Sequence, residues 1–509
     1  MAGEGGADWR RPERRRGQGR RGGRRRRRQR AGPESGGDAA GTQAAVVEES
    51  GTEAAPESPG QGRFGFGEDA SAEEGAVQVE FDDGLEGELD EASGEPRREA
   101  APRGSRPAQG GRPGPGRAGG PRGERPGAAR PPQPPAEPLP AELSGVLILE
   151  HGGFGTLRQE QTNWLPARTD VFVPLRLIQQ HKLREGSLVA GRVSRGQKHK
   201  YALVEVTTVD GKNPNEVKNA PAFKNLTTID PDFHYATGDV TGEVSMRIVD
   251  LLCPIGRGQR GLIVAPPRTG KTTLLKQFAK GIELGYPDVH LFVLLVDERP
   301  EEATDWQRST KGKVFASTSD ESAKTHVQLA EAVWTRCTRL VELGHDVVLL
   351  LDSLTRLSRA YNNLSAGSGR TMSGGLDSRA MERPRQIFGS ARNTEKAGSL
   401  TILGTALIDT GSRMDQLIFE EFKGTGNMEL VLSRRLADRR IFPAIDIEKS
   451  GTRKEEKILS SKKLKSVHIL RRVLQRMNPY EAMELLITKL DEVAQTDDFL
   501  KRFEVDPEA

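Results

Sequence analysis

The stretch that decides the fold is Ala265-Pro266-Pro267-Arg268-Thr269-Gly270-Lys271-Thr272-Thr273, which follows the apolar segment Gly261–Ala265 and opens a helical pattern. A Gly-Lys-Thr turn between a buried strand and a helix is typical of a P-loop, whose backbone N–H groups hold phosphates. These residues are therefore the predicted ATP-binding loop. Lys271 is expected to reach the outer phosphates, and the Thr272 hydroxyl to bind Mg²⁺. Ala265 stands where the general pattern has glycine.

Two further apolar segments end in acidic residues. Val347–Leu351 is followed by Asp352, and Leu291–Val296 leads to Glu298. An aspartate at such a strand end can hold magnesium through water, and a carboxylate there can act on the attacking water. Spacing alone leaves Glu298 equally consistent with a helix-capping or surface acid. The combination of all three strand ends favours an ATPase.

Alternation of strands and helices continues over residues 249–509. Leu400–Ala406 and Met428–Leu432 read as further strands, and apolar residues recur at helical spacing from Val327 to Val341. This order predicts the α/β class, with a largely parallel sheet covered by helices. We therefore expect one ATPase domain over residues 249–509.

Residues 141–212 carry a different pattern. Short apolar segments alternate there with turn residues; they are Val146–Leu149, Gly155–Arg158, Val171–Val173, Leu188–Val193 and Tyr201–Val206. Leu175–Leu183 reads as a short helix. About five short strands in this length indicate a small barrel of the oligonucleotide-binding type, which would bind RNA. A polar, turn-rich connector is expected over residues 213–248.

Residues 1–140 form a low-complexity block with no strand or helix period, for which we predict a disordered tail. It begins with an arginine- and glycine-rich run, continues with an acidic stretch, and ends rich in proline, glycine and arginine. Such a tail is either a solvated segment or an electrostatic arm that holds RNA. Composition does not decide between them.

The composition excludes several classes of protein. The two cysteines, Cys253 and Cys337, lie far apart, which argues against a disulfide framework and a cysteine-based zinc site. The longest apolar segments are too short to span a bilayer. The arginine-rich start has no apolar core behind it, unlike a secretory signal. We expect a soluble cytoplasmic protein that does not contact a membrane.

Longer strings indicate a family. They are Pro254-Ile255-Gly256-Arg257-Gly258-Gln259-Arg260-Gly261-Leu262-Ile263-Val264-Ala265-Pro266-Pro267, Leu407-Ile408-Asp409-Thr410-Gly411-Ser412, Glu420-Glu421-Phe422-Lys423-Gly424-Thr425-Gly426-Asn427-Met428-Glu429-Leu430 and Ser450-Gly451-Thr452-Arg453-Lys454-Glu455-Glu456. With these strings the chain resembles the Rho family of transcription termination factors over roughly residues 145 to 500. This resemblance implies a homohexameric ring of RecA-like domains that binds ATP between neighbours.

The resemblance also implies roles for single residues. Lys271 and Thr272 match the P-loop positions, Asp352 the magnesium-binding acid and Glu298 the catalytic carboxylate.

At the interface between subunits, Arg453 matches the arginine that a neighbour inserts toward the γ-phosphate, where a cation stabilises transition-state charge. Arg440 and Arg299 match further catalytic arginines there, and Phe442 matches the residue that packs on adenine.

The family handles RNA inside the ring with two loops. The first corresponds to Ser368–Gly375, where Arg370 and Thr371 are the predicted contacts, and the second to Thr410–Met414, where Arg413 is. Arginine can grip phosphates in a bidentate manner.

The outer RNA site of the family lies in the barrel. Phe154 and Arg158 agree with its motif, but Thr156 stands where a second aromatic residue is usual. Each lost stacking platform removes about 1–3 kcal/mol per base. We therefore expect an outer site that relies more on charge.

The second half of that site departs in the same way. Lys200 replaces the first member of an aromatic pair, and Tyr201 matches the second. Phe172 is another stacking platform. Phe154 is expected to be exposed, whereas Phe172 and Tyr201 are equally consistent with the barrel core.

The resemblance implies an RNA-dependent ATPase and 5′-to-3′ translocase that releases transcripts from the RNA polymerase elongation complex. One alternative is a subunit of a rotary ATPase, which shares the RecA-like core but has no pore loops for RNA. Another is an RNA-binding protein with a degenerate ATPase.

Overall fold

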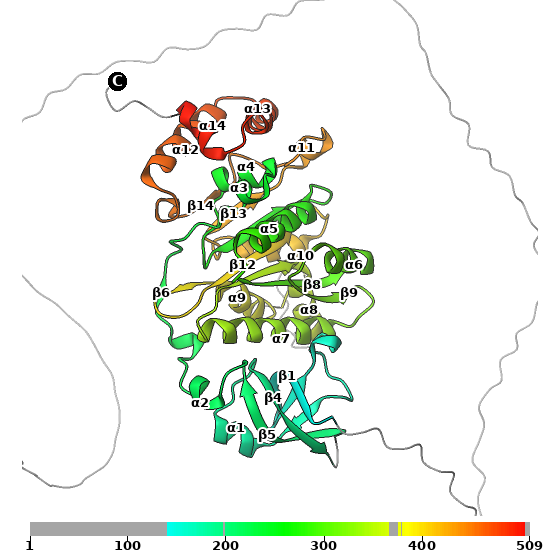
Figure 1. Ribbon diagram of the computed structural model, residues 1–509. Helices are drawn as coiled ribbons and strands as arrows, with labels where there is room; N and C mark the ends of the chain where they lie inside the picture. Colours follow the sequence, from blue (N-terminus) through cyan, green and yellow to red (C-terminus); the bar gives the residue numbers. More distant parts are fainter. Residues whose placement is uncertain (1–139, 197–198, 366–374, 378, 504–509) are drawn as a thin grey trace, which may run out of the picture. The chain divides into compact units, whose positions relative to one another are not determined.

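The computed structural model describes residues 140–196, 199–365, 375–377 and 379–503. All of the predicted tail except Pro140 lies outside this part, as do Arg370 and Thr371. The described part contains a closed barrel, a seven-stranded sheet and a small sheet of β6 (Thr228–Ile229) and β11 (Asn393–Thr394) (Figure 1). Within it, no helix is both long enough and apolar enough to cross a membrane.

The barrel has five strands in the order β1-β2-β3-β5-β4, and it closes because β1 pairs with both β2 and β4. The strands are β1 (Glu142–Leu149), β2 (Gly155–Arg158), β3 (Val171–Val173), β4 (Leu188–Arg195) and β5 (Tyr201–Val209), with helix α1 (Leu175–His181) between β3 and β4. Alternate residues such as Leu147, Val189 and Leu203 fill the interior. The predicted barrel is confirmed.

The larger sheet has the order β14-β13-β7-β12-β10-β8-β9. Its strands are β7 (Arg260–Ala265), β8 (His290–Glu298), β9 (Lys313–Thr318), β10 (Val347–Asp352), β12 (Leu400–Leu407), β13 (Met428–Val431) and β14 (Gly451–Thr452). All neighbours run parallel except β13 and β14. The parallel sheet that the strand–helix alternation predicted is confirmed.

Helices cover both faces of this sheet, with α5 and α7 on opposite sides (Figure 1). One layer contains α4 (Val244–Leu252), α5 (Lys271–Gly285), α12 (Ser461–Leu474) and α13 (Pro479–Asp491); the other contains α7 (Ala323–Glu342), α8 (Leu354–Ser365), α9 (Glu382–Gly389) and α10 (Arg413–Phe422). Successive residues of a strand point to opposite faces of the sheet, so Ile263 packs in the first layer and Leu262 in the second. Burial on both faces explains why these strands read as continuous apolar runs.

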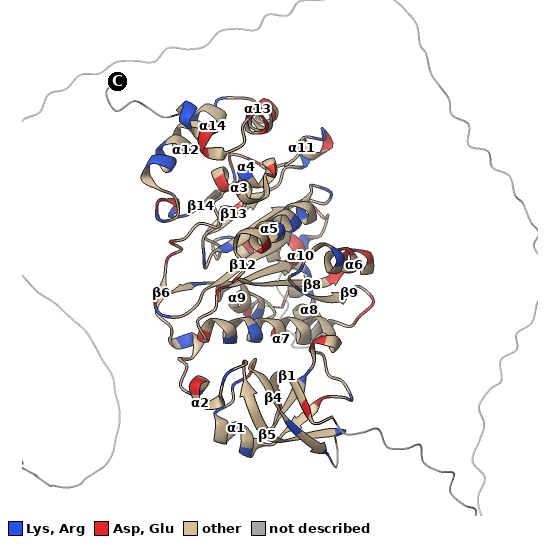
Figure 2. Ribbon diagram, in the orientation of Figure 1, with Lys and Arg blue, Asp and Glu red and all other residues tan. Residues whose placement is uncertain are grey.

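The described residues contain further helices. They are α2 (Pro214–Val217), α3 (Thr237–Thr241), α6 (Pro300–Ser309), α11 (Arg434–Asp438) and α14 (Thr496–Leu500), together with the 3₁₀ helices η1 (Glu160–Thr162), η2 (Phe223–Asn225), η3 (Glu455–Lys457) and η4 (Lys501–Phe503). Glu301 and Glu302 lie in the first turn of α6, at the positive end of the helix dipole (Figure 2).

The barrel packs on the ATPase domain through Trp164, which follows η1. Its side chain is 3% exposed and its ring centroid lies 4.1 Å from that of Phe315 in β9. On another side of the contact, Arg336 of α7 forms an ion pair with Asp210, which follows β5. An aromatic side chain and a buried ion pair therefore join the barrel to the larger sheet.

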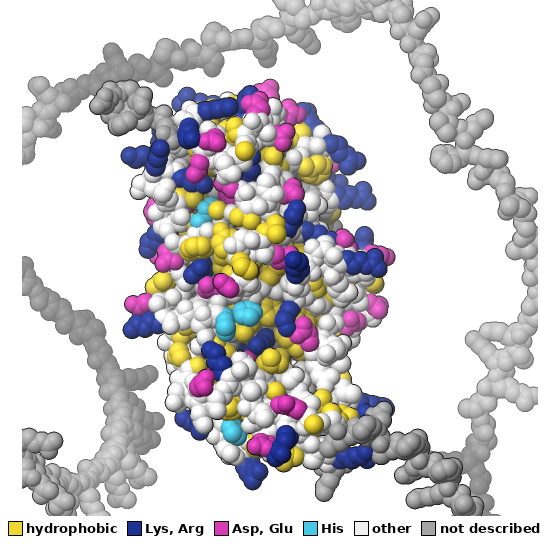
Figure 3. Space-filling model, viewed as in Figure 1, with side chains coloured by type: hydrophobic (Ala, Val, Ile, Leu, Met, Phe, Trp, Pro, Cys, Tyr) yellow, Lys and Arg dark blue, Asp and Glu magenta, His cyan; other side chains and the backbone are white. Residues whose placement is uncertain are grey.

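The folded surface carries both signs of charge. The face in Figure 3 mixes lysine, arginine and acidic side chains, with apolar side chains gathered near its middle. The net charge of the whole chain is only +4. Binding sites must therefore be sought in the placement of particular side chains.

Candidate functional site

The loop between β7 and α5 has the backbone of a phosphate-binding turn. Arg268 and Gly270 adopt positive φ angles of 66° and 88°, and Gly270 caps the N-terminus of α5. The buried Thr269 hydroxyl donates a hydrogen bond to the carbonyl of Pro266 at 2.7 Å, which closes the turn. Thr272 and the more exposed Thr273 follow in the first turn of the helix. The N-terminus of α5 is therefore available to an anion.

Lys271 meets both predicted acids at this loop. Its ammonium group lies 2.6 Å from Asp352 Oδ1 and 3.5 Å from Glu298 Oε1. Strand β12 lies between β7 and β10, and its Thr405 hydroxyl donates to the same Asp352 oxygen at 2.7 Å. Three parallel strands that end at one edge thus bring a lysine and two carboxylates together.

Burial and charge set the protonation of this cluster. Burial alone lowers the pKa of Lys271, but Asp352 and Glu298 outweigh it, so the pKa lies above its ordinary value. Burial, and then the charge of Asp352, raise the pKa of Glu298, although Lys271 and Arg356 oppose them. Arg356 of α8 lies 3.7 Å from Glu298 Oε2. A carboxylate with a raised pKa beside a phosphate-binding loop suits proton transfer.

The donor set also suits a divalent cation. Asp352 is 1% exposed, and its Oδ2 atom is buried without a hydrogen-bond partner among the described residues. A buried carboxylate oxygen without a partner is costly, and a bound cation would satisfy it. Thr272, on the first turn of α5, supplies a hydroxyl of the kind that P-loops use with magnesium.

Phe442 lies against the phosphate loop. Its ring atoms lie 3.5 and 3.6 Å from the position that a Cβ atom at Gly270 would occupy, and the side chain is 43% exposed. Arg440, two residues earlier, is exposed and has a positive φ of 62°. Arg299 is exposed at the N-cap of α6, directly after Glu298. The structure therefore gathers these three predicted residues on the nucleotide side of the sheet.

Arg453 is placed elsewhere. It follows Thr452 of β14, which pairs with Met428, and Met428 pairs with Gly261 near the start of β7. The phosphate loop begins after Ala265, at the other end of β7. At roughly 3.3 Å per residue, Gly261 and Ala265 lie roughly 13 Å apart along β7. Arg453 is exposed and lies at the end of the sheet opposite to the phosphate loop of its own chain.

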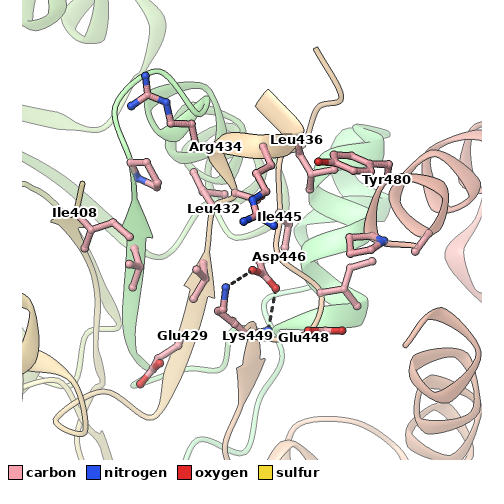
Figure 4. A pocket seen from close by; sticks show the side chains of 18 of the residues that line it. Ile408, Glu429, Leu432, Arg434, Leu436, Ile445, Asp446, Glu448, Lys449 and Tyr480 are labelled. Carbon is pink, nitrogen blue, oxygen red and sulfur yellow. Dashed lines mark hydrogen bonds and ion pairs between the residues drawn. The ribbon is translucent and has the colours of Figure 1, made fainter. Parts of the chain in front are cut away.

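A large cavity of about 1110 Å³ lies beside the phosphate site and is not the phosphate site itself. It lies between β13 and the C-terminal helices and is lined by Leu432, Ile445 and Tyr480, with Lys449 paired to Asp446 at its rim (Figure 4). Pro266 is its one residue from the phosphate loop. Cavity size therefore does not locate the chemistry here.

The second predicted pore loop is held by an ion pair between the buried Asp415 and the partly exposed Arg359. Asp415 of α10 is 1% exposed, accepts hydrogen bonds from Arg359 Nε at 2.7 Å and Nη2 at 2.5 Å, and accepts another from the Thr410 hydroxyl at 2.6 Å. Arg413 stays exposed at the start of α10. Arg359 lies on α8, which also follows the metal-binding candidate Asp352 in sequence.

The first predicted pore loop is described only at its end. The Asn362 side chain donates to the carbonyl of Gly375 at 3.1 Å and accepts from the backbone N–H of Asp377 at 2.7 Å. A Cβ atom at Gly375 would lie 3.6 Å from the Met414 methyl group. The two predicted pore segments therefore approach each other.

Three rings form a row on the barrel. The ring centroids of Phe154 and Phe172 lie 5.4 Å apart, and His199 stacks on Phe172 at 5.1 Å with an interplanar angle of 16°. Phe154 and Phe172 are half-buried and lie outside the apolar interior of the barrel. Tyr201 packs in part against that interior, and the Lys200 ammonium lies 5.3 Å from its ring centroid.

Arg158 and Thr156 are largely buried. Arg158 is 6% exposed, forms an ion pair with Glu150 at 3.0 Å, and donates to the carbonyl of Trp164 at 3.3 Å. Thr156 is 7% exposed and donates to Glu150 at 3.4 Å. These contacts give Arg158 a structural part in the barrel, and its contact with RNA stays a prediction.

Sequence reasoning missed four side chains of these sites. Thr405 and Arg356 reach the acids from elements without a motif, and Arg359 and His199 stand in segments whose spacing carries no signal. Each becomes visible only when separate elements are brought together.

Comparison with known proteins separates the two domains. Residues 245–452 match the family model described as the ATP synthase alpha/beta family, nucleotide-binding domain. Residues 143–215 match the model described as the Rho termination factor, RNA-binding domain. The chain thus combines a nucleotide-binding ATPase domain with an RNA-binding domain.

Three transcription termination factors match the chain over most of their own length. The transcription termination factor Rho of Cereibacter sphaeroides is 49% identical over 360 residues, which are 70% of this chain and 85% of that protein. Rho of Escherichia coli is 47% identical over 363 residues, 70% of this chain and 86% of that protein. Rho of Borreliella burgdorferi is 48% identical over 361 residues, 70% of each chain. The chain therefore belongs to the Rho family of transcription termination factors.

Proposed function

We propose that the protein is an RNA-stimulated ATPase that moves 5′-to-3′ along single-stranded RNA and releases transcripts from RNA polymerase in the cytoplasm. The observation that carries the proposal is the position of Arg453. It stands exposed at the end of the sheet away from its own phosphate loop. An arginine needed at the γ-phosphate would therefore come from a neighbouring chain, as a ring of identical subunits allows.

Hydrolysis would use groups that the fold already brings together. Glu298 takes the proton of the attacking water, and its raised pKa favours this role. Lys271 neutralises the outer phosphates, and Arg453 of a neighbour stabilises the charge of the transition state. Arg299 and Arg440, both exposed on the nucleotide side, would complete the interface.

The nucleotide base and the metal would have defined partners. Phe442, in contact distance of the loop at Gly270, supplies a half-exposed ring for the adenine. Thr272 and Asp352 would hold Mg²⁺, which neutralises phosphate charge when it is bound. The Lys271 ammonium, which lies beside Asp352, would hold the outer phosphates next to this metal site.

RNA would be held at two places. In the barrel, Phe154 and Phe172 offer rings for stacking, with Tyr201 and Arg158 as further members. In the ring, Arg413 and the segment with Arg370 and Thr371 would contact phosphates. The ion pair between Arg359 and Asp415 would couple ATP hydrolysis to RNA movement. Arg359 lies on α8, which follows the strand that ends at Asp352, and Asp415 anchors the second pore loop.

We propose a tail over residues 1–140, an RNA-binding barrel over 141–212, a connector over 213–248 and the motor over 249–509.

ATP hydrolysis by the wild type and by Glu298→Ala, each with and without a cytosine-rich RNA, tests the proposal. Strong stimulation by RNA in the wild type and its loss in the variant are expected. Hydrolysis by the wild type that is indifferent to RNA would overturn the translocase and favour the rotary ATPase. Absence of hydrolysis in the wild type would favour an RNA-binding protein with a degenerate ATPase.

A further inference from the structure

A groove of about 900 Å³ runs between the barrel, helix α7 and the start of α9. On the barrel side it is lined by His151, in the turn between β1 and β2 that also carries Phe154. On the other domain it is lined by Arg383, in the first turn of α9, which follows the first pore segment in sequence. The groove thus borders both the barrel turn of the outer RNA site and the helix that follows the first pore segment.

Cationic groups are placed on aromatic rings along this groove. The Arg383 guanidinium lies 4.8 Å from the centroid of the Trp334 ring. An adjoining cavity of about 570 Å³ shares Trp334 and Lys224 with the groove, and there Arg392 lies 4.4 Å from the ring centroid of Phe223. Interleaved aromatic and basic side chains are the chemistry that binds single-stranded nucleic acid without sequence preference.

The acids of the groove are already engaged. Glu331 receives two hydrogen bonds from Arg383, both at 2.7 Å. Glu342 pairs with Arg184 at 3.0 Å and accepts from the backbone N–H of Phe223 at 2.7 Å. Burial raises the pKa of Glu185.

The basic side chains exceed the acids in number. Five lysine and arginine side chains line the two cavities, against three glutamates. Lys224 is exposed at the point where the cavities meet. The electrostatic balance favours a polyanion over an acidic protein segment.

We propose that this groove binds the stretch of single-stranded RNA that passes between the barrel and the ring loops, with the Arg383–Trp334 pair as a stacking platform and Lys224 as a phosphate contact. The inference rests on the proposed function, because it gives a path to the RNA that the motor moves. It assigns RNA contacts to side chains outside both predicted RNA sites.

Binding of two cytosine-rich RNAs to the full-length protein tests this path. The short RNA has about 8 nucleotides, which suits one barrel of this type, and the other is long enough to reach the pore. Lys224→Glu is compared with Lys465→Glu, a matched charge reversal at an exposed site of α12. Lys224→Glu should weaken only the long RNA and make its slope of log affinity against log salt shallower by about 0.7.

Trp334→Leu and Trp334→Phe form a second pair. Loss of one stacked base should weaken the long RNA about 5- to 150-fold in the leucine variant, while phenylalanine retains most of the affinity. Equal affinities of the Lys224 and Lys465 variants for the long RNA would overturn the inference, as would equal weakening of both RNAs by Lys224→Glu. Stimulation of wild-type hydrolysis by RNA is measured alongside. If RNA stimulates hydrolysis but the variants bind the long RNA as their controls do, the proposed function is kept and only the groove is rejected. If RNA does not stimulate hydrolysis, the proposed function itself is rejected.

Discussion

The ammonium group of Lys271 lies 2.6 Å from Asp352 Oδ1, across the strand that separates β7 from β10. The second oxygen of Asp352 is buried and has no hydrogen-bond partner within the described residues. Lysine and aspartate therefore form a direct ion pair beside the phosphate loop, and the second oxygen of Asp352 is left for a cation. Removal of either charge tests its role.

Asp352→Asn should separate metal binding from nucleotide binding. The variant keeps the size of the side chain but loses the anionic oxygen, so the part of the ATP affinity that depends on Mg²⁺ should disappear. Affinity in the presence of a chelator should be unchanged or higher. ATP binding with and without Mg²⁺ measures both. Thr405→Val removes only one hydrogen bond to Asp352 and serves as control; a full Mg²⁺ effect in Asp352→Asn would contradict the assignment.

If Glu298 is the base, the rate of ATP hydrolysis should fall on the acid side of its pH profile. The protonated carboxyl group cannot accept a proton, so hydrolysis should fall as the pH drops through its pKa. Because burial and Asp352 raise that pKa, the fall should begin above the ordinary range of a glutamate. Glu298→Gln should lower the rate by about 10²- to 10⁴-fold and leave no acid limb. Glu301→Gln, at an exposed neighbour, should behave as the wild type; an unchanged acid limb in Glu298→Gln would exclude Glu298 as the base.

Lys271→Ala and Arg453→Ala should complement each other. Each variant alone is expected to be inactive, since every interface lacks one of the two cations. In a mixture, a site with intact Lys271 can face a neighbour with intact Arg453, so part of the ATPase activity should return. Hydrolysis by mixtures of varied ratio measures this. No recovery, with mixed assembly shown by differently tagged chains, would mean that Arg453 does not act on a neighbour.

Trp164→Ala should destabilise the fold. The side chain is 3% exposed and contacts Phe315, so its truncation leaves a cavity that costs about 3–5 kcal/mol. Denaturant unfolding at fixed chain concentration measures the free energy of unfolding. Trp164→Phe should lower the free energy of unfolding by less than Trp164→Ala. A wild-type midpoint for the alanine variant would show that this contact adds no stability.

Deletion of residues 1–140 should leave the ATPase intact and lower RNA affinity at low salt. Arginine-rich segments bind phosphates by charge, so the difference from the full chain should shrink as salt rises. A salt titration of RNA binding by both chains makes the comparison. Equal affinity at every salt concentration would reject the tail as an RNA arm.

Local patterns predicted much of this protein. The P-loop, the strand ends at Asp352 and Glu298, and the five barrel strands depend on residue types at short spacing, and such spacing reports strands, turns and helices directly. Arg453 is different, because its position opposite the phosphate loop follows from the pairing of β14 with β13 at the edge of the sheet. No local pattern predicts such pairing.

By itself, the sequence determined the phosphate loop, the parallel α/β order, the barrel and the family. These features depend on neighbours along the chain and on the periodicity of apolar residues. Tertiary structure alone decided that Thr405 would support Asp352, that His199 would stack on Phe172, and that Arg158 would be buried beside Glu150. Those contacts join residues on different elements, and their distances are set by how strands and helices pack in three dimensions.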